Sequence, residues 1–247
     1  MASDSSIVLI VGAAGGIGQA LGQRLAARGC QLIVAGRNEG ALAPLAEGWG
    51  AQPLVLDARD PEAVVAAVAQ VVERWGRIDG AVNLAGSIVL KPSHSTSPAE
   101  WHDIVATNLT TAFALVRAVA PVMAKADGGS IVLMSSAAAR VGLANHDAIA
   151  AAKAGVTGLA LAAAATYAPR GVRINVVAPG LIRTPLASRI VNNPAALKVS
   201  EAMHPLGRIG EPAEVASAID WLLNPDQSWV TGQVLGVDGG LGSLRGR

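Results

Sequence analysis

The sequence contains few aromatic residues, few charged residues and a single cysteine. Aromatic side chains occupy 3% of the 247 positions, with one tyrosine and one phenylalanine. The single cysteine, Cys30, excludes an internal disulfide bond and is typical of a protein from a reducing compartment. The 19 Lys and Arg residues are balanced by 18 Asp and Glu residues, which predicts no basic face for nucleic acid or an anionic membrane.

Signals for export, membrane insertion and metal binding are also lacking. Residues 1–6 are polar without the basic start of a signal peptide, and the alanine-rich stretch 148–168 is interrupted by Lys153 and by glycines. We therefore expect a cytoplasmic protein with no membrane partner and no nucleic-acid partner. The histidines are scattered, and no spacing of His, Cys, Asp or Glu resembles a metal site, so none is predicted.

The chain is rich in apolar strands that alternate with helical segments. Hydrophobic residues make up 51% of the chain and charged residues 15%, which excludes disorder and favours a large buried sheet. The alternation predicts a single α/β domain over residues 1–247, with a doubly wound, Rossmann-like parallel sheet of about seven strands. Strands are expected at 7–11, 31–35, 53–56, 80–84, 130–134, 172–177 and 233–237. Helices are expected at 17–28, 39–48, 61–75, 98–124, 146–168 and 211–223.

A glycine-rich turn joins the first strand to the first helix. Gly12, Gly16 and Gly18 follow the apolar run 7–11, and Ile17 begins the helical pattern. Together with the second strand this is a βαβ unit whose turn directs backbone N–H groups and a helix N-terminus at one point. Glycines let the backbone approach a phosphate where a Cβ would clash. The turn therefore predicts a nucleotide site, with tight packing alone as the alternative, because the spacing differs from the common G-x-G-x-x-G.

The ends of the second and third strands bear on the choice of cofactor. The second strand is followed by Arg37, where a dinucleotide site often has an acid that accepts from a ribose 2′-hydroxyl. A guanidinium suits a 2′-phosphate, which predicts NADP(H), with NAD(H) as the second choice and a solvated loop arginine as the alternative. Asp57 ends the third strand and is placed to accept from the adenine amino group.

These motifs resemble those of the short-chain dehydrogenase/reductase family, in its main single-domain subfamily, over essentially the whole chain. The family's glycine motif matches with Val11 where threonine is usual, and its Asn-Asn-Ala-Gly motif matches as Asn83-Leu84-Ala85-Gly86 at the end of the fourth strand. The residues that carry these two matches are Gly12, Gly16, Ile17, Gly18, Asn83, Ala85 and Gly86. The resemblance implies hydride transfer between NAD(P)(H) and a small carbonyl or alcohol substrate, and a homotetramer formed through the helices at 98–124 and 146–168 and the C-terminal segment.

The resemblance also implies roles for residues later in the chain. Asn108 matches the helix asparagine whose carbonyl holds a water of the proton relay, and Ser136 matches the catalytic serine. Lys153 matches the lysine that binds the nicotinamide ribose. The turn that would hold the nicotinamide amide comprises Pro179, Gly180, Ile182 and Thr184.

The family's catalytic tyrosine is missing. Four residues before Lys153, where the family has tyrosine, this chain has Ile149, whose side chain neither donates nor accepts a proton. The single tyrosine, Tyr167, lies about 21 Å beyond Lys153 along a helix. Tyr167 is therefore interpreted as a helix-packing or interface residue.

Three hypotheses follow from this absence. In the first, His146 supplies the proton, because a helical turn would place it on the face of Ile149 and imidazole titrates near neutral pH. The alternative for this segment is a helix start capped by Asn145 or Asp147, with His146 solvated. In the second, a reactive carbonyl or iminium-like substrate is reduced without a strong protein acid. In the third, the protein binds NADP(H) without redox chemistry, as a sensor or a silent subunit.

Two expectations concern packing and the substrate. The segment 184–210 is the least regular part of the sequence and follows a late strand, so it is a candidate lid over the substrate, with a surface excursion as the alternative. The only phenylalanine, Phe113, is expected in the core.

Overall fold

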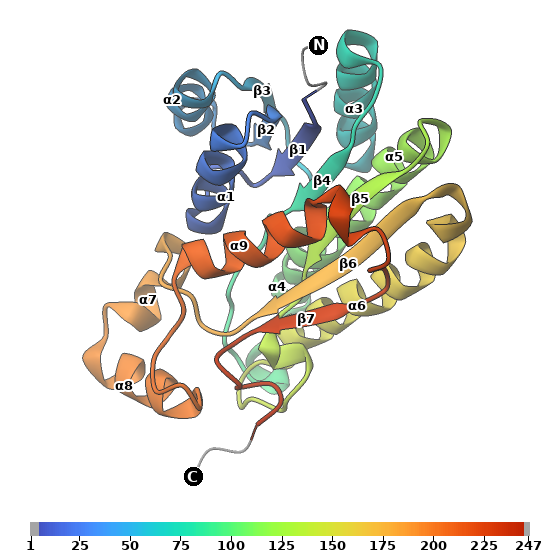
Figure 1. Cartoon of the computed structure of the whole chain (residues 1–247). Coiled ribbons are helices and arrows are strands. Elements are labelled where there is room, and N and C mark those ends of the chain that lie inside the picture. The colour runs from blue at the N-terminus through green and yellow to red at the C-terminus, as the bar shows by residue number, and fades with distance from the viewer. Residues whose placement is uncertain (1–4, 245–247) are drawn as a thin grey trace.

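Seven parallel strands form one sheet in the order β3-β2-β1-β4-β5-β6-β7 (Figure 1). The coordinates are a computed structural model that describes residues 5–244. The strands are β1 (Ile7–Val11), β2 (Gln31–Gly36), β3 (Gln52–Val55), β4 (Gly80–Asn83), β5 (Gly129–Met134), β6 (Val172–Pro179) and β7 (Val234–Val237). All seven expected strands are confirmed, with ends that differ from the prediction by no more than about two residues.

Helices cover both faces of this sheet. They are α1 (Gly16–Ala27), α2 (Glu39–Trp49), α3 (Pro61–Trp75), α4 (Pro98–Val105), α5 (Thr111–Lys125), α6 (Asp147–Tyr167), α7 (Ser188–Val191), α8 (Pro194–Met203) and α9 (Pro212–Leu223). Figure 1 shows α1 and α9 in front of the sheet, with α5 and α6 behind it. The doubly wound Rossmann-like fold expected from the sequence is confirmed.

The side chains of β1 explain why its sequence is continuously apolar. Ile7, Leu9 and Val11 belong to the core cluster formed with α3, α5 and α6. Val8 and Ile10 belong to the cluster on the opposite face, formed with α1, α2 and α9. Since successive side chains of a strand alternate between faces, a strand covered on both sides has no polar positions.

The strand order reverses direction between β1 and β4, and this reversal fixes the site. The chain moves outward from β1 to β2 and β3, then returns to add β4 on the other side of β1. In an open parallel sheet, the crevice outside the carboxyl ends at such a switch point binds ligands. The glycine turn after β1 and the Asn83–Gly86 segment after β4 meet at this edge.

The expected helix at 98–124 is interrupted by a π turn at Ala106–Thr110, between α4 and α5. Asn108 lies in this turn, and its Nδ2 donates to the Ile104 carbonyl oxygen at 3.0 Å. Thr111 Oγ1 donates to the Thr107 carbonyl oxygen at 2.9 Å. Side chains that bond to carbonyls of the preceding turn compete with the α-helical ladder, and π turns are frequent at functional sites.

The segment 184–210 is more regular than its composition indicates. It contains α7 and α8, which lie together beside the carboxyl edge of the sheet (Figure 1). Asn193 caps α8 by accepting from Ala195 N and Ala196 N, and Pro194 takes the first helical position. The Asn-Asn-Pro sequence is thus a helix start within the segment that was expected to be the least regular part of the chain.

Two further findings concern apolar helices. The spans Pro98–Lys125 and Asp147–Arg170 are long and apolar enough to cross a membrane by length and composition alone, but their helices α5 and α6 supply core residues against the sheet.

The expectation that Phe113 is a core residue is wrong, because its side chain on α5 is 46% exposed.

Candidate active site

The glycine turn after β1 is pressed against two other segments of the carboxyl edge. Gly12 has φ +82°, and a Cβ there would lie 2.8 Å from backbone atoms of Leu84 and Ala85. A Cβ on Gly16 would lie 2.9 Å from Thr184 Cγ2. Glycine is therefore required for the close approach of β1, β4 and the turn after β6.

The first turn of α1 is open to an anion. Its N-cap residue, Gly15, makes no side-chain cap hydrogen bond, and the first turn contains no acidic residue. The N–H groups of a first helical turn have no intrahelical acceptors, so they favour a phosphate. Ile17, on this turn, lines a groove that runs across the carboxyl edge of the sheet to Thr184.

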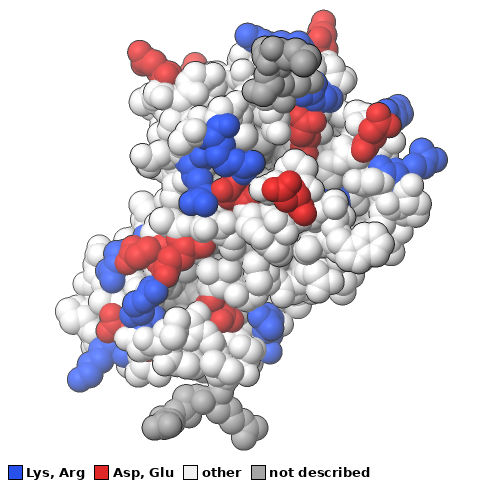
Figure 2. Space-filling model, viewed as in Figure 1, with Lys and Arg blue, Asp and Glu red and all other residues white. Residues whose placement is uncertain are grey.

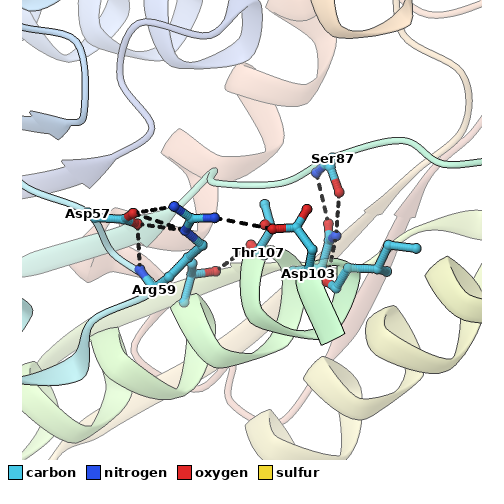
Figure 3. A network of polar contacts seen from close by, with 8 residues as sticks. Asp57, Arg59, Ser87, Asp103 and Thr107 are labelled. Carbon is cyan, nitrogen blue, oxygen red and sulfur yellow. Dashed lines mark hydrogen bonds and ion pairs between the residues drawn. The ribbon is translucent and has the colours of Figure 1, made fainter. Parts of the chain in front are cut away.

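Two charged residues lie at this edge after β2 and β3, where the adenosine was expected: the exposed Arg37, and Asp57, whose carboxylate is already hydrogen-bonded. Arg37 follows β2, is exposed, and has no ion pair among residues 5–244. Arg59 donates to both carboxylate oxygens of Asp57 at 2.6–3.0 Å and to Asp103 at 3.2 Å, as Figure 3 shows. These hydrogen bonds from Arg59 hold the pKa of Asp57 below its usual value. An adenine amino group would therefore share Asp57 with Arg59.

The turn after β4 is organised by two asparagines. Asn83 is buried; its Nδ2 donates to Thr111 Oγ1 at 3.0 Å and its Oδ1 accepts from Ala85 N at 3.2 Å. This side chain faces α5 and fixes the turn, and the expected contact of Asn83 with the cofactor stays a prediction. Asn108 Oδ1 accepts from Ser87 N, and Asn108 Nδ2 donates to Ser87 Oγ at 2.9 Å.

Ser87 is a groove residue that the sequence analysis missed. It follows the Asn83–Gly86 motif directly and lies above the π turn, where Figure 3 shows it on the loop after β4. A Cβ on Gly86 would lie 3.1 Å from Asn108 Oδ1 and 3.6 Å from Lys153 Nζ. The π turn, the loop after β4 and α6 therefore converge on Gly86. The position directly after the motif was the available signal.

Lys153 is a buried ammonium at the centre of this site. Its Nζ donates to the Met134 carbonyl oxygen at 3.0 Å, which anchors α6 to the end of β5. Burial lowers the pKa of Lys153 from 10.5 to about 8, because the charged form is held away from water. At pH 7 the ammonium is therefore still charged in most molecules.

The two serines after β5 take different parts. Ser135 is buried, and its Oγ donates to the Lys153 carbonyl oxygen at 2.9 Å, so it joins β5 to α6. Ser136 is half-buried, and its Oγ accepts from Ala138 N at 3.2 Å. Ser136 lines both the groove and the neighbouring cavity, and its predicted contact with a substrate stays a prediction.

The turn after β6 closes the groove on its far side. Pro179, Gly180, Ile182 and Thr184 all line the groove. A second residue that the sequence analysis missed lies behind this turn: His204, after α8, is buried and accepts from Leu181 N through Nε2 at 3.1 Å.

Beside the groove lies a cavity of about 520 Å³ between the turn after β6 and helix α8. Its walls are mostly apolar, with residues from the loop after β4, from α6 and the segment before it, from the turn after β6, from α7, from α8 and from the segment after β7: Ile88, Leu90, Leu143, Ile149, Leu181, Ile190, Val199, Met203 and Leu241. No Asp, Glu, Lys or Arg of the described chain lines it. On the outer face in Figure 2, by contrast, charges of both signs are intermingled.

Comparisons with known proteins agree with this geometry. A family model described as Enoyl-(Acyl carrier protein) reductase matches residues 12–242. The 3-oxoacyl-(acyl-carrier-protein) reductase FabG of Thermotoga maritima is 37% identical over 246 residues, covering 98% of this chain and 99% of that protein. FabG of Vibrio harveyi is 35% identical over 240 residues, covering 96% and 98%. The crystal structure of a variant actinorhodin polyketide ketoreductase with NADPH has a TM-score of 0.92 at 31% identity, covering 99% and 100%.

The chain belongs to the short-chain dehydrogenase/reductase family. This family consists of oxidoreductases that use a nicotinamide cofactor, and the match extends over nearly the whole chain. The groove suits such a cofactor, because Gly12, Gly16 and Gly86 add no side chain where the surrounding segments approach one another, and a helix N-terminus without a capping side chain lies beside it.

From its spacing to Lys153, Ile149 was predicted to stand where the family has tyrosine. It is 6% exposed, lies one helical turn before Lys153 on α6, and lines both the groove and the apolar cavity. Tyr167 packs against the core cluster at the other end of α6, as expected for a packing residue. The wall shared by the groove and the cavity is therefore aliphatic at this position.

His146 is half-buried in the wall of the same cavity. It is the N-cap residue of α6, lines the cavity together with Ile149 and Ser136, and donates from Nδ1 to the Ala144 carbonyl oxygen at 2.8 Å. The alternative of a helix capped by Asn145 or Asp147 is wrong. Asn145 lies outside the helix with φ 62°, and the carboxylate of Asp147 accepts from Ser93 N and Oγ.

Proposed function

We propose that this chain is an NADPH-dependent reductase of uncharged, apolar carbonyl compounds. The observation that carries the proposal is the position of the uncharged cavity, which adjoins the cofactor groove at Ser136 and Ile149. A charged substrate would lose its hydration there without a countercharge, whereas an apolar one gains from burial.

When bound, NADPH would supply a hydride to the carbonyl carbon. The first turn of α1 would hold the pyrophosphate and Arg37 the 2′-phosphate. Lys153 would bind the nicotinamide ribose, and its ammonium would stabilise negative charge that develops on the carbonyl oxygen. The Ser136 hydroxyl would hold that oxygen by a hydrogen bond, and the turn from Pro179 to Thr184 would hold the nicotinamide amide.

His146 would give the proton to the new alkoxide. Its Nδ1–H bond to Ala144 leaves Nε2 as the nitrogen that takes up and delivers a proton. Its place on the wall that also holds Ser136 supports this role. The segment 184–210, with α7 and α8, would act as the lid of the cavity.

Replacing His146 with alanine is expected to lower turnover of an apolar ketone about tenfold. The affinity for NADPH is expected to stay unchanged, because His146 lines the cavity and not the groove. Steady-state kinetics and fluorescence titration of NADPH check the two parts. The matched control is His102→Ala, which removes an exposed histidine of α4. Unaltered turnover in His146→Ala would remove this residue from the mechanism.

Replacing Arg37 with alanine is expected to weaken NADPH binding about 10–100-fold, because a charge-assisted hydrogen bond contributes about 1.5–3 kcal/mol. NADH binding is expected to change less than about threefold. Fluorescence titration with both cofactors measures the two affinities, and Arg117→Ala, which removes the partner of Glu62, serves as the control. Equal losses for NADPH and NADH would show that Arg37 does not contact a 2′-phosphate.

A panel of carbonyl compounds tests the proposed substrate class. We expect kcat/KM for cyclic aliphatic and aryl ketones to exceed that for 2-oxo acids by about 100-fold or more. A 3-oxoacyl thioester belongs in the panel, because the FabG relatives are named as reductases of that substrate class. A preference for the oxo acids would contradict the apolar assignment.

One observation favours a second function. With Ile149 in place of tyrosine, the chain keeps the cofactor groove but lacks the family's proton donor. An NADP(H)-binding sensor or silent subunit would bind NADPH with unaltered affinity and oxidise it with no member of the panel. Turnover with any ketone excludes this alternative.

We also propose a cytoplasmic homotetramer. Large apolar side chains lie exposed on the outer faces of α5 and α6, at Phe113 with 46% and Leu161 with 50% exposure, and on α9, at Trp221 with 45%. Exposed apolar groups of this size are typical of subunit interfaces. Size-exclusion chromatography with light scattering is expected to give a mass four times that of one chain. The mass of one chain would contradict the tetramer.

A further inference from the structure

We propose that His204 is a positioning residue that ties the lid helix α8 to the turn expected to hold the nicotinamide. His204 comes directly after α8, and its side chain is buried, with 3% of the residue exposed. Its ring contacts the carboxyl edge of the sheet at Leu181, which lies 23 residues earlier in the chain. The proposal rests on the function proposed above, because it assigns this turn and α8 to the two halves of one site.

The two ring nitrogens have different partners, and these partners fix the tautomer. Leu181 N–H donates to Nε2 across 3.1 Å, so Nε2 is unprotonated. The Ser200 carbonyl oxygen, 2.6 Å from Nδ1, only accepts, so the proton is on Nδ1. The neutral imidazole therefore bridges the last turn of α8 and the turn after β6, using both nitrogens.

The ring also lies directly against the backbone of that turn. A Cβ on Gly180 would lie 2.5 Å from His204 Nε2, so any other residue at Gly180 would displace the imidazole. Gly180 is thus required for the bridge, in addition to its place in the turn. Gly180 and His204 therefore depend on each other for their positions.

His204 lies in the wall between two cavities. It lines the apolar cavity of about 520 Å³ and also a second cavity of about 450 Å³, which Gly180, Leu181 and Asp238 line as well. Displacing the ring would move α8 away from the substrate and would also release the Leu181 amide. Loss of the bridge is therefore expected to weaken substrate and cofactor binding together.

Asparagine and glutamine separate the two halves of the bridge. In His204→Asn the amide can replace Nδ1 and donate to Ser200, but it is too short to accept from Leu181. In His204→Gln the longer side chain can place its oxygen where Nε2 was. We expect the Asn variant to raise the ketone KM and the NADPH dissociation constant about tenfold each, with kcat lowered less than about threefold. The Gln variant should recover most of both losses.

Hydrogen exchange provides a readout that needs no turnover. In the Asn variant the amides of Leu181 and of residues 185–203 are expected to exchange faster than in the wild type, while those of β1 and β4 stay unchanged. The control is His102→Asn, at an exposed histidine of α4. Equal effects of Asn and Gln, or unaltered exchange of the lid, would overturn the proposal even if the protein proves to have no redox activity.

Nitrogen NMR of the unmodified protein tests the bridge without any variant. We expect the His204 resonances of a neutral ring with the proton on Nδ1 and a free lone pair on Nε2. A proton on Nε2 would contradict the hydrogen bond from Leu181 and with it the proposal.

Discussion

Replacing Ile149 with tyrosine is expected to raise kcat with an apolar ketone about 100-fold. A general acid typically contributes about 10²–10⁴-fold, and His146 is expected to supply about tenfold of this already. The new phenol would extend from α6 into the groove that Lys153 and Ser136 also line, beside the cavity of about 520 Å³. The nearby ammonium would lower the pKa of the phenol and so make it a better acid at neutral pH.

Two further variants show whether the hydroxyl is responsible. Ile149→Phe adds the ring without the hydroxyl and is expected to give no gain. In the Ile149→Tyr background, His146→Ala should cost less than about twofold, because the phenol takes over proton transfer. Steady-state kcat at saturating NADPH checks all three. A Phe variant as fast as the Tyr variant would show that Ile149 limits the reaction by shape and not by chemistry.

Replacing Lys153 with methionine is expected to lower kcat/KM about 10²–10³-fold while stabilising the fold. The ammonium is the positive charge nearest the reacting oxygen in the proposed site, and removing such a charge costs about this factor. Its proton is present below a pKa of about 8, so wild-type turnover should fall as pH rises through that value. In Lys153→Met the part of this decline centred near pH 8 should be absent, whereas a decline that follows the proton of His146 should remain. A decline near pH 8 that persists would assign it to another group.

The stability of the same variant follows from the direction of the pKa shift. Burial lowers the pKa of Lys153 from 10.5 to about 8, so between these values the unfolded chain binds more protons than the folded one. Wild-type stability should therefore rise with pH across this window. At pH 7 the Lys153→Met variant no longer buries a charge, but it loses the hydrogen bond to the Met134 carbonyl oxygen. Its free energy of unfolding is therefore expected to exceed that of the wild type by about 1–2 kcal/mol. Denaturant titrations of both proteins at pH 7 measure this difference, and a variant less stable than the wild type would contradict it. Titrations of the wild type between about pH 8 and pH 10.5 measure the rise of stability with pH.

The parts of the site that depend on local sequence were predictable. The strand, glycine turn and helix at residues 7–28 are encoded by neighbouring residues, and the structure places Gly12, Gly16 and Gly18 where only glycine fits. The sequence also predicts that the family's tyrosine is missing, because Ile149 stands four residues before Lys153. The cavity beside Ile149 could not be predicted, because it is formed by side chains from several separate segments.

The features that leave no pattern in the sequence were missed. The π turn at Asn108 forms because side chains bond to carbonyls of the preceding turn, and such bonds leave no periodic signal in the sequence. His204 acquires its role from Leu181, 23 residues earlier in the chain. The exposure of Phe113 depends on which face of α5 is left uncovered by the rest of the fold.

A single-turnover experiment tests most directly whether this chain performs redox chemistry without the family's tyrosine. The protein, saturated with NADPH that carries deuterium on the transferred position of its nicotinamide, is mixed with an apolar cyclic ketone, and the cofactor fluorescence is followed. The proposed function predicts that each chain oxidises its bound NADPH and that the deuterium appears on the carbinol carbon of the product. Bound NADPH that stays reduced with every ketone of the panel would contradict the proposed reductase and identify a cofactor-binding protein without redox activity.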